Sequence, residues 1–208
     1  MLNQNQNKPF IQWSHGPQSA SYIAPKCVIG IDRDGTINED LGTYCYRRED
    51  FKPIPGSLEA IALLRNAGHK IAIITNQGGI AQKLYTEEQV DALHDYMLEL
   101  LGKAGCPSID AIYYSASNFK EDPYVKPNVG MFKRCEQEHK HIKFSEGYYV
   151  GDKMSDLKAA MTMGATPVLV RTGYGVKTES ELSRYAYRKI RERVLIFDDL
   201  ISFARSIA

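Results

Sequence analysis

Short apolar segments alternate with helix-forming segments through most of this chain, and this alternation limits the possible fold more than any other feature. Apolar runs of four to six residues, each followed by a helical pattern, are typical of a parallel sheet that is covered on both faces. We expect strands at residues 27–31, 70–75, 110–115, 147–152, 166–171 and 194–197. The fold class is therefore α/β, with a mostly parallel sheet and helices on both faces.

The expected helices lie between these strands. Pro55 and Gly56 precede an apolar stripe that ends at Gly68, and Thr86 with Gln89 three residues later forms a capping box. We expect helices over residues 57–68 and 86–102, helices that begin near Asn128 and near Ser155, and a terminal helix over residues 198–207.

The length of 208 residues is that of one ordinary domain. Residues 1–25 are rich in Asn, Gln and Ser and are interrupted by Pro9 and Pro17, so we interpret them as an arm outside the fold. The domain is expected over residues 26–208. A monomer and a small homo-oligomer both remain open.

Charge and cysteine content exclude several classes of function. The 26 basic and 25 acidic residues leave a net charge of +1, which creates no global field for nucleic acid or an anionic membrane. The four cysteines are far apart and form no CxxC pair, which argues against a disulfide scaffold. Neither a spanning helix nor a signal peptide is visible. We expect a cytoplasmic protein, and we interpret the basic segment 183–194 as a solvated helix.

Two carboxylates follow the first expected strand, one residue apart. Ligands of such sheets bind at the carboxyl ends of the strands, and alternate strand residues face the same way, so Asp32 and Asp34 can address one site. Like charges this close repel each other unless a cation or a proton lies between them. An acidic surface turn is the alternative interpretation.

The turn after the second strand and a later lysine could hold an anion. Thr75, Asn76, Gln77 and the following glycines offer hydroxyl, amide and backbone N–H donors, although turn chemistry alone also favours Asn, Gln and Gly. Lys126 precedes Pro127, which fixes its approach, and an ammonium group could neutralise a phosphate. A solvated lysine remains the alternative.

The fourth strand ends at Asp152, and Asp156 follows one turn later. These residues would place further carboxylates beside Asp32 and Asp34. Oxygen ligands in this number suit a hard divalent cation such as Mg²⁺. A capping role for Ser155 or Asp156 is compatible with the same positions.

The order of these groups resembles that of the haloacid dehalogenase (HAD) superfamily of phosphatases. The matching strings are similar to those of the branch that contains D-glycero-D-manno-heptose 1,7-bisphosphate phosphatases and histidinol-phosphatases. They are DRDGTIN (32–38), TNQGGIA (75–81), KPNVGMF (126–132) and VGDKMSDLKAA (150–160). The resemblance implies a Rossmann-like HAD fold without a cap domain, in which loops 38–54 and 115–125 would determine selectivity.

The resemblance also implies a role for each matching residue. Asp32 would be the nucleophile that forms an aspartyl-phosphate, and Asp34 the general acid and then base. Thr75 and Lys126 would stabilise the phosphoryl group during transfer. Candidates for contact with substrate or phosphate are Asp40, Gly42, Asn76, Gln77 and Lys153.

The metal implied by the resemblance is Mg²⁺. The carboxylates of Asp32 and Asp152 and the backbone carbonyl of Asp34 would hold it, with Asp156 beside these ligands. Zinc-containing relatives carry Cys-x-His and Cys-x-Cys pairs, which are replaced here by Ser115-Ala116-Ser117 and EDPYV, so no zinc is expected. The loop over residues 115–125 would then be held by the packing of Tyr114, Phe119 and Tyr124.

A second departure from the resemblance is Val125, which stands where the heptose-specific branch places an arginine before the lysine. We expect a Mg²⁺-dependent phosphomonoesterase whose partner is a small phosphorylated metabolite, namely a sugar phosphate of the heptose bisphosphate type. The alternatives are a phosphatase for histidinol-phosphate or another small phosphomonoester, a catalytically idle phosphate-binding module, and a nucleic-acid end phosphatase.

Overall fold

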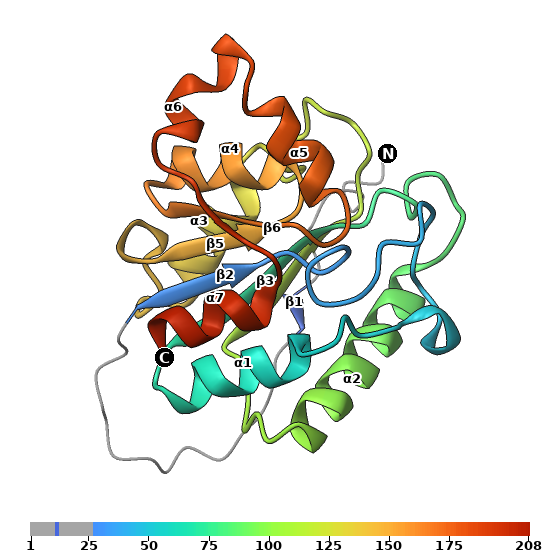
Figure 1. Ribbon diagram of the computed structural model, residues 1–208. Helices are drawn as coiled ribbons and strands as arrows, with labels where there is room; N and C mark the ends of the chain where they lie inside the picture. The colour runs from blue at the N-terminus through green and yellow to red at the C-terminus, as the bar shows by residue number, and fades with distance from the viewer. Residues whose placement is uncertain (1–10, 13–26) are drawn as a thin grey trace.

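Six parallel strands form the centre of the computed structural model, which describes residues 11–12 and 27–208 (Figure 1). A seventh, antiparallel strand lies at one edge, and the spatial order is β1-β4-β3-β2-β5-β6-β7. The strands are β1 (Ile11–Gln12), β2 (Val28–Ile31), β3 (Lys70–Asn76), β4 (Ala111–Ser115), β5 (Tyr148–Gly151), β6 (Thr166–Val170) and β7 (Leu195–Phe197). The six parallel strands begin and end within one residue of the expected positions, so the predicted fold class is confirmed.

The direction of the chain across the sheet changes at β2. The chain passes from β2 to β3 and β4 on one side, and then returns to β5, β6 and β7 on the other side. In parallel sheets, a reversal of this kind opens a crevice outside the carboxyl ends of the two central strands. Candidate residues that follow β2, β3 and β5 are therefore brought together.

Helices cover both faces of the sheet, as expected (Figure 1). Helices α1, α2 and α7 lie on one face, where Ile29 and Ile31 of β2 pack into a core with Leu64 and Phe203. The other face carries α3 and α4, which pack against β2, β3, β4 and β5. The helices are α1 (Ser57–Asn66), α2 (Glu87–Lys103), α3 (Gly130–Glu138), α4 (Met154–Met163), α5 (Gly175–Glu181), α6 (Arg188–Arg191) and α7 (Leu200–Ile207), with 3₁₀ turns η1 (Arg48–Asp50), η2 (Phe144–Glu146) and η3 (Tyr185–Tyr187).

The capping box predicted from Thr86 and Gln89 is present at the start of α2. The Thr86 hydroxyl accepts a hydrogen bond from the Gln89 backbone N–H, and the Gln89 side chain accepts one from the Thr86 N–H. Among residues 27–208, the connections between strands contain these helices and turns and no inserted domain. No helix in this part of the chain is long and apolar enough to cross a lipid bilayer. None of the four cysteines forms a disulfide with another described residue.

Three elements differ from expectation. Strand β1 lies within residues 1–25, where we expected no strand, and it pairs with the otherwise open edge of β4; the rest of that arm lies outside the described residues. Helix α5 was not expected. The prediction of one helix over residues 183–194 is wrong, because this segment forms η3 and the single helical turn α6. Only Ile190 is buried in these two elements. One apolar anchor is too little to hold a longer amphipathic helix against the domain.

Candidate active site

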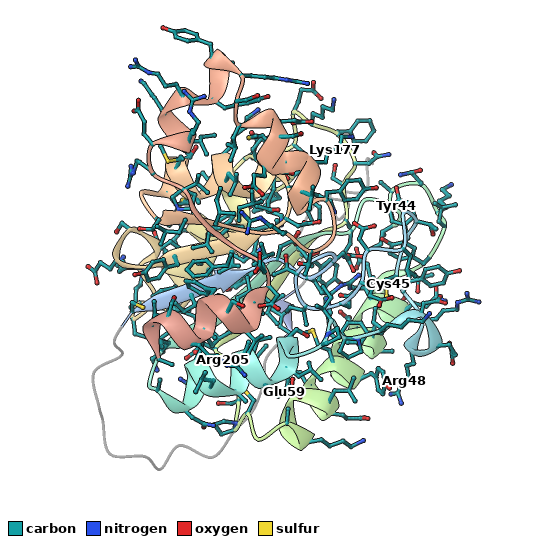
Figure 2. The ribbon with its side chains drawn as sticks, in the orientation of Figure 1. Tyr44, Cys45, Arg48, Glu59, Lys177 and Arg205 are labelled. Carbon is teal, nitrogen blue, oxygen red and sulfur yellow. The ribbon has the colours of Figure 1, made fainter. Side chains whose placement is uncertain are left out.

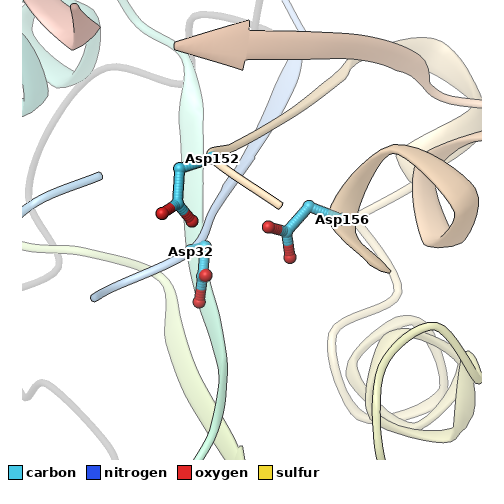
Figure 3. Close-up of side chains that lie close together, drawn as sticks. All are labelled: Asp32, Asp152 and Asp156. Carbon is cyan, nitrogen blue, oxygen red and sulfur yellow. The ribbon is translucent and has the colours of Figure 1, made fainter. Parts of the chain in front are cut away.

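The candidate catalytic residues gather at the carboxyl edge of the sheet. Asp32 follows β2, Thr75 is the second-last residue of β3, and Asp152 follows β5. Lys126 lies in the loop before α3, and Asp156 lies in the first turn of α4. Figure 3 shows the carboxylates of Asp32, Asp152 and Asp156 converging on one space. The parallel topology therefore unites residues that are up to 124 positions apart.

Lys126 is the fixed cation of this site. Its Nζ lies 2.8 Å from Asp32 Oδ1 and 2.8 Å from Asp156 Oδ1, and it donates hydrogen bonds to the Ile74 carbonyl at 2.9 Å and the Tyr149 hydroxyl at 3.0 Å. The side chain is only 2% exposed. Burial alone would lower the pKa of Lys126, but the charges of Asp156 and Asp32 outweigh it and raise the pKa well above its usual value. Lys126 is therefore a permanently charged, oriented ammonium group.

The two oxygens of Asp32 have different environments. Oδ1 accepts hydrogen bonds from the Arg33 backbone N–H at 2.8 Å and pairs with Lys126. No described residue donates a hydrogen bond to Oδ2. Burial raises the pKa of Asp32, and the Lys126 ammonium offsets part of that rise. One oxygen is thus fixed, while the other is left for a ligand.

Asp34 is held by four donors from three residues. Arg33 Nε and Nη2 contact its carboxylate, Asn38 Nδ2 donates to Oδ1 at 2.9 Å, and Gln77 Nε2 donates to Oδ2 at 3.0 Å. Burial would raise the pKa of Asp34, but the Arg33 guanidinium and these hydrogen bonds more than compensate and lower it. In the free enzyme the Asp34 carboxylate is therefore ionised, and both of its oxygens are held in position.

Asn76 and Gln77 support the catalytic candidates through hydrogen bonds. Asn76 accepts from the Lys126 N–H at 3.0 Å and donates to the Lys126 carbonyl at 3.2 Å. Gln77 donates to the Thr75 hydroxyl at 3.1 Å as well as to Asp34, and it accepts from the Tyr85 hydroxyl at 3.0 Å. Asn76, the last residue of β3, therefore positions the backbone of Lys126, and Gln77, the next residue, positions the Asp34 carboxylate.

The remaining substrate-contact candidates lie together beside these groups. Lys153 Nζ forms an ion pair with Asp40 Oδ2 at 2.8 Å, and the Gly42 N–H donates to Asp40 Oδ1 at 2.8 Å. The same ammonium lies 4.0 Å from Asp152 Oδ1. Asp40, Gly42 and Lys153 thus form one linked group next to the carboxylate cluster.

The carboxylate cluster has the donors that a hard cation requires. Asp32, Asp152 and Asp156 each offer an oxygen within 4.8 Å of the others. Asp152 Oδ2 accepts a hydrogen bond from the Tyr174 N–H, whereas the buried Oδ1 has no hydrogen-bond partner among the described residues. Burial, with the like charges of Asp32 and Asp156, raises the pKa of Asp152 to about 8. These oxygens fit Mg²⁺, and no cysteine or histidine of residues 27–208 belongs to the cluster.

Glycines make room for Asp152. Gly35 has φ +88° and Gly173 has φ +54°, and a Cβ atom at either position would collide with the Asp152 carboxylate. The Thr172 hydroxyl donates to the Gly35 carbonyl at 2.6 Å and ties the two turns together. Only glycine combines these backbone angles with the required space.

The loop over residues 115–125 is held differently from the prediction. Phe119 was expected to anchor it by packing but is 68% exposed, so this prediction is wrong. Asn128 Nδ2 instead donates to the carbonyls of Lys120 and Asp122, and Asp122 Oδ1 accepts from the Tyr124 N–H. Local hydrogen bonds of this kind hold a loop without an apolar anchor. Tyr114 is buried, and Tyr124 is partly buried against the core, as expected.

Sequence reasoning missed several residues of the site. The buried arginine between the two aspartates, Arg33, could have been found, because a charged residue at the end of a buried strand needs a partner. Tyr149, which contacts the Lys126 ammonium, gave no signal beyond its place in an apolar strand. The backbone N–H of Tyr174 and the hydroxyl of Thr172 come from a turn that carries no distinctive pattern.

Comparisons with known proteins agree with this geometry. The sequence profile of the family described as polynucleotide kinase 3 phosphatase matches residues 28–166. A D-glycero-beta-D-manno-heptose-1,7-bisphosphate 7-phosphatase of Pseudomonas putida is 38% identical over 180 residues, which cover 86% of this chain and 98% of that protein. A D-glycero-D-manno-heptose-1,7-bisphosphate 7-phosphatase of Chlorobaculum tepidum is 36% identical over 166 residues, covering 74% and 83% of the two chains.

Two solved structures of heptose bisphosphate phosphatases are also similar to this chain. The crystal structure of a D,D-heptose 1,7-bisphosphate phosphatase from B. bronchiseptica, complexed with magnesium and phosphate, matches with a TM-score of 0.78 and 30% identity, covering 87% of this chain and 97% of that one. The corresponding enzyme from Burkholderia thailandensis matches with a TM-score of 0.65 and 30% identity over the same shares.

Proposed function

Because this chain belongs to the polynucleotide kinase 3 phosphatase family and is a phosphatase of the HAD superfamily, we propose that it is a Mg²⁺-dependent phosphomonoesterase that acts on a sugar phosphate through an aspartyl-phosphate at Asp32. The observation that carries this proposal is the Asp32 carboxylate, with one oxygen fixed by Lys126 and the other without a donor among the described residues. A nucleophile needs this combination of fixed direction and an available lone pair.

In the first step, an Asp32 oxygen attacks phosphorus and the bond from phosphorus to the sugar oxygen breaks. Asp34 takes up a proton from the phosphate monoanion of the bound substrate and transfers it to the departing alkoxide, so the sugar leaves as an alcohol. In the second step, Asp34 accepts a proton from water, whose oxygen attacks the phosphorus of the aspartyl-phosphate. Inorganic phosphate leaves, and Asp32 is again a carboxylate.

Lys126 and Thr75 stabilise the charge on the transferring phosphoryl group. Lys126 Nζ already lies 2.8 Å from Asp32 and is buried, so its charge acts at full strength without a change of position. The Thr75 hydroxyl lies at the end of β3 and receives a hydrogen bond from Gln77, which leaves its own proton for a phosphoryl oxygen.

We assign the carboxylates of Asp32 and Asp152 and the Asp34 carbonyl as the residues that hold Mg²⁺. When bound, Mg²⁺ neutralises phosphoryl charge and draws the reacting groups together. Asp156 has a different role in this proposal, because its oxygens are engaged by Lys126 and by the Lys153 N–H at 3.0 Å. Asp156 orients Lys126.

Removal of the metal should be visible in thermal stability. The raised pKa of Asp152 means that the protonated carboxyl stabilises the metal-free fold, and this stabilisation is lost as the pH rises through about 8. The increase in Tm on adding Mg²⁺ should therefore grow from neutral pH towards pH ~8 and then level off. Asp152→Asn should raise the metal-free Tm and abolish the response to Mg²⁺.

The measurement is Tm with EDTA and with Mg²⁺ across the neutral to alkaline range. Asp95→Asn, which removes an exposed carboxylate on α2, is the control and should respond to Mg²⁺ like the wild type. A wild-type protein whose Tm ignores Mg²⁺ at every pH would contradict the metal assignment.

The substrate is proposed to be of the heptose bisphosphate type, in line with the names of the relatives. Val125 lacks the guanidinium that could hold a second phosphate, and it is only 8% exposed. A charge-assisted hydrogen bond at that position would be worth about 1.5–3 kcal/mol, which is roughly tenfold to a hundredfold in kcat/KM. We therefore expect a flatter preference between heptose bisphosphate and simple monophosphates than enzymes with an arginine at this position should show.

Matched mono- and bisphosphate sugars measure this preference directly. A wild-type enzyme that prefers the bisphosphate by about a thousandfold would contradict the role of Val125, because it would require more than one such bond elsewhere. Val125 is buried, so an arginine side chain at this position fits only if the loop over residues 115–125 opens. With that movement, Val125→Arg should raise kcat/KM for the bisphosphate and leave that for the monophosphate unchanged.

A phosphatase screen with Mg²⁺ tests the proposed function as a whole. We expect phosphate release from sugar mono- and bisphosphates and no release in EDTA. Histidinol-phosphate and a 3′-phosphorylated oligonucleotide belong in the same screen, and faster turnover of either would overturn the proposed substrate class. We further propose one phosphatase domain over residues 26–208, a cytoplasmic location, and a small metabolite as the partner rather than nucleic acid or a membrane.

A further inference from the structure

A buried network behind Asp34 has no part in the reaction as described so far. The Arg33 side chain is fully buried and donates from all three nitrogens. Nε and Nη2 contact both oxygens of Asp34 at 2.8 to 3.1 Å, and Nη2 also donates to the Cys45 carbonyl at 2.8 Å. Nη1 lies 3.2 Å from His94 Nε2.

His94 is suited to accept this hydrogen bond. It is fully buried on α2, and its burial together with the Arg33 charge lowers its pKa to about 3, so the ring is neutral at physiological pH. A neutral ring has one nitrogen that accepts, and Nε2 faces the guanidinium. The ring packs against Tyr114, with centroids 5.6 Å apart, which fixes its plane.

The network therefore fixes the guanidinium on two sides. Cys45 lies on the loop between β2 and α1, beside α2, and supplies a carbonyl from that loop (Figure 2). His94 supplies an acceptor from α2. A planar guanidinium bound at two such points can contact Asp34 in only a narrow range of orientations, which a flexible ammonium group would not enforce.

We propose that Arg33 is a positioning residue that directs the Asp34 carboxylate at the leaving-group oxygen, and that His94 and the Cys45 carbonyl hold Arg33 in the orientation needed. This inference rests on the proposed role of Asp34 as the general acid. It assigns a catalytic consequence to a buried ion pair that would otherwise serve only to compensate charge.

Substrates with different leaving groups distinguish a positioning role of Arg33 from mere compensation of the Asp34 charge. In a reaction with a covalent intermediate, kcat/KM reports only the steps up to the phosphorylated enzyme. A sugar alkoxide needs a proton as it leaves, whereas p-nitrophenolate leaves without one. A loss of orientation at Asp34 therefore lowers kcat/KM for the sugar phosphate and largely spares p-nitrophenyl phosphate.

Arg33→Lys is the decisive variant, because it keeps the charge and removes the planar fork. It should lower kcat/KM for a sugar phosphate by about 10–10²-fold and for p-nitrophenyl phosphate by less than about threefold, since a positioned general acid is worth about 10²–10⁴-fold. His94→Leu removes the acceptor of Arg33 Nη1 and should act in the same direction with a smaller effect, whereas His94→Gln, which keeps an acceptor, should restore much of the loss.

Arg65→Lys is the matched control. Arg65 also donates hydrogen bonds from Nε and Nη1 to backbone carbonyls, those of Ser108 and His69. It lies in α1 just before β3 begins, at the end of the strands away from the candidate active site. Its substitution should leave the ratio of the two kcat/KM values unchanged.

Equal losses on both substrates, or no loss on either, would overturn the inference. Should Arg33→Lys fail to fold by circular dichroism, the difference between His94→Leu and His94→Gln decides in the same way. A wild-type protein that hydrolyses neither phosphate in Mg²⁺ would instead refute the proposed function, and the inference with it.

Discussion

Replacement of Asp32 by Asn should abolish turnover and leave the fold intact. The amide keeps the size of the side chain and an oxygen that can accept from the Arg33 N–H and from Lys126. It also removes one negative charge from a cluster in which Asp152 and Asp156 already repel each other. Without the carboxylate there is no nucleophile, so kcat should fall by more than about 10⁴-fold.

The measurement is kcat under saturating sugar phosphate and Mg²⁺, with Tm recorded on the same preparation. Asp50→Asn, on η1 and paired with the exposed Arg47, is the matched control and should keep wild-type activity. An Asp32→Asn protein with wild-type turnover would show that the chemistry does not pass through this residue.

Lys126→Met should damage both stability and activity. It leaves Asp32 and Asp156 buried without their cation, and breaking a buried pair in this way costs about 3–5 kcal/mol of unfolding free energy. It also removes the charge beside the phosphoryl group, for which a loss of about 10²–10³-fold in kcat is typical. Denaturant unfolding and steady-state kinetics measure the two effects separately.

A double variant distinguishes the two effects of Lys126. Lys126→Met combined with Asp156→Asn removes one of the stranded charges and should recover part of the stability but none of the activity. Lys133→Met, at an exposed position on α3, is the control and should change neither property. Full activity in Lys126→Met would contradict the assignment of this residue to the phosphoryl group.

The sheet could be predicted because its signal is local. Runs such as those of β3 and β6 are short, apolar and rich in Ile and Val, and their ends are marked by Gly, Asn or Arg. Once these strands are parallel, their carboxyl ends must meet, so the proximity of Asp32, Thr75 and Asp152 follows from the topology alone.

The parts that could not be predicted depend on contacts between distant residues. Lys126 reaches Asp32 because Asn76, 50 residues earlier, holds its backbone at both the N–H and the carbonyl. The contact between Arg33 and His94 spans 61 residues. Neither contact leaves a periodic pattern in the sequence. The exposure of Phe119 has the same origin, since the loop is held by the Asn128 amide rather than by an apolar side chain.

The position of the covalent phosphate tests the central claim most directly. Enzyme quenched in acid during turnover is treated with borohydride, which reduces an aspartyl-phosphate to homoserine, and is then digested with trypsin. Cleavage after Lys26 and Arg33 yields residues 27–33, in which Asp32 is the sole acidic side chain. We predict homoserine at position 32 in this peptide, and its absence when substrate is omitted. An unmodified peptide from enzyme that is turning over rapidly, or homoserine at Asp34 instead, would contradict the proposed nucleophile.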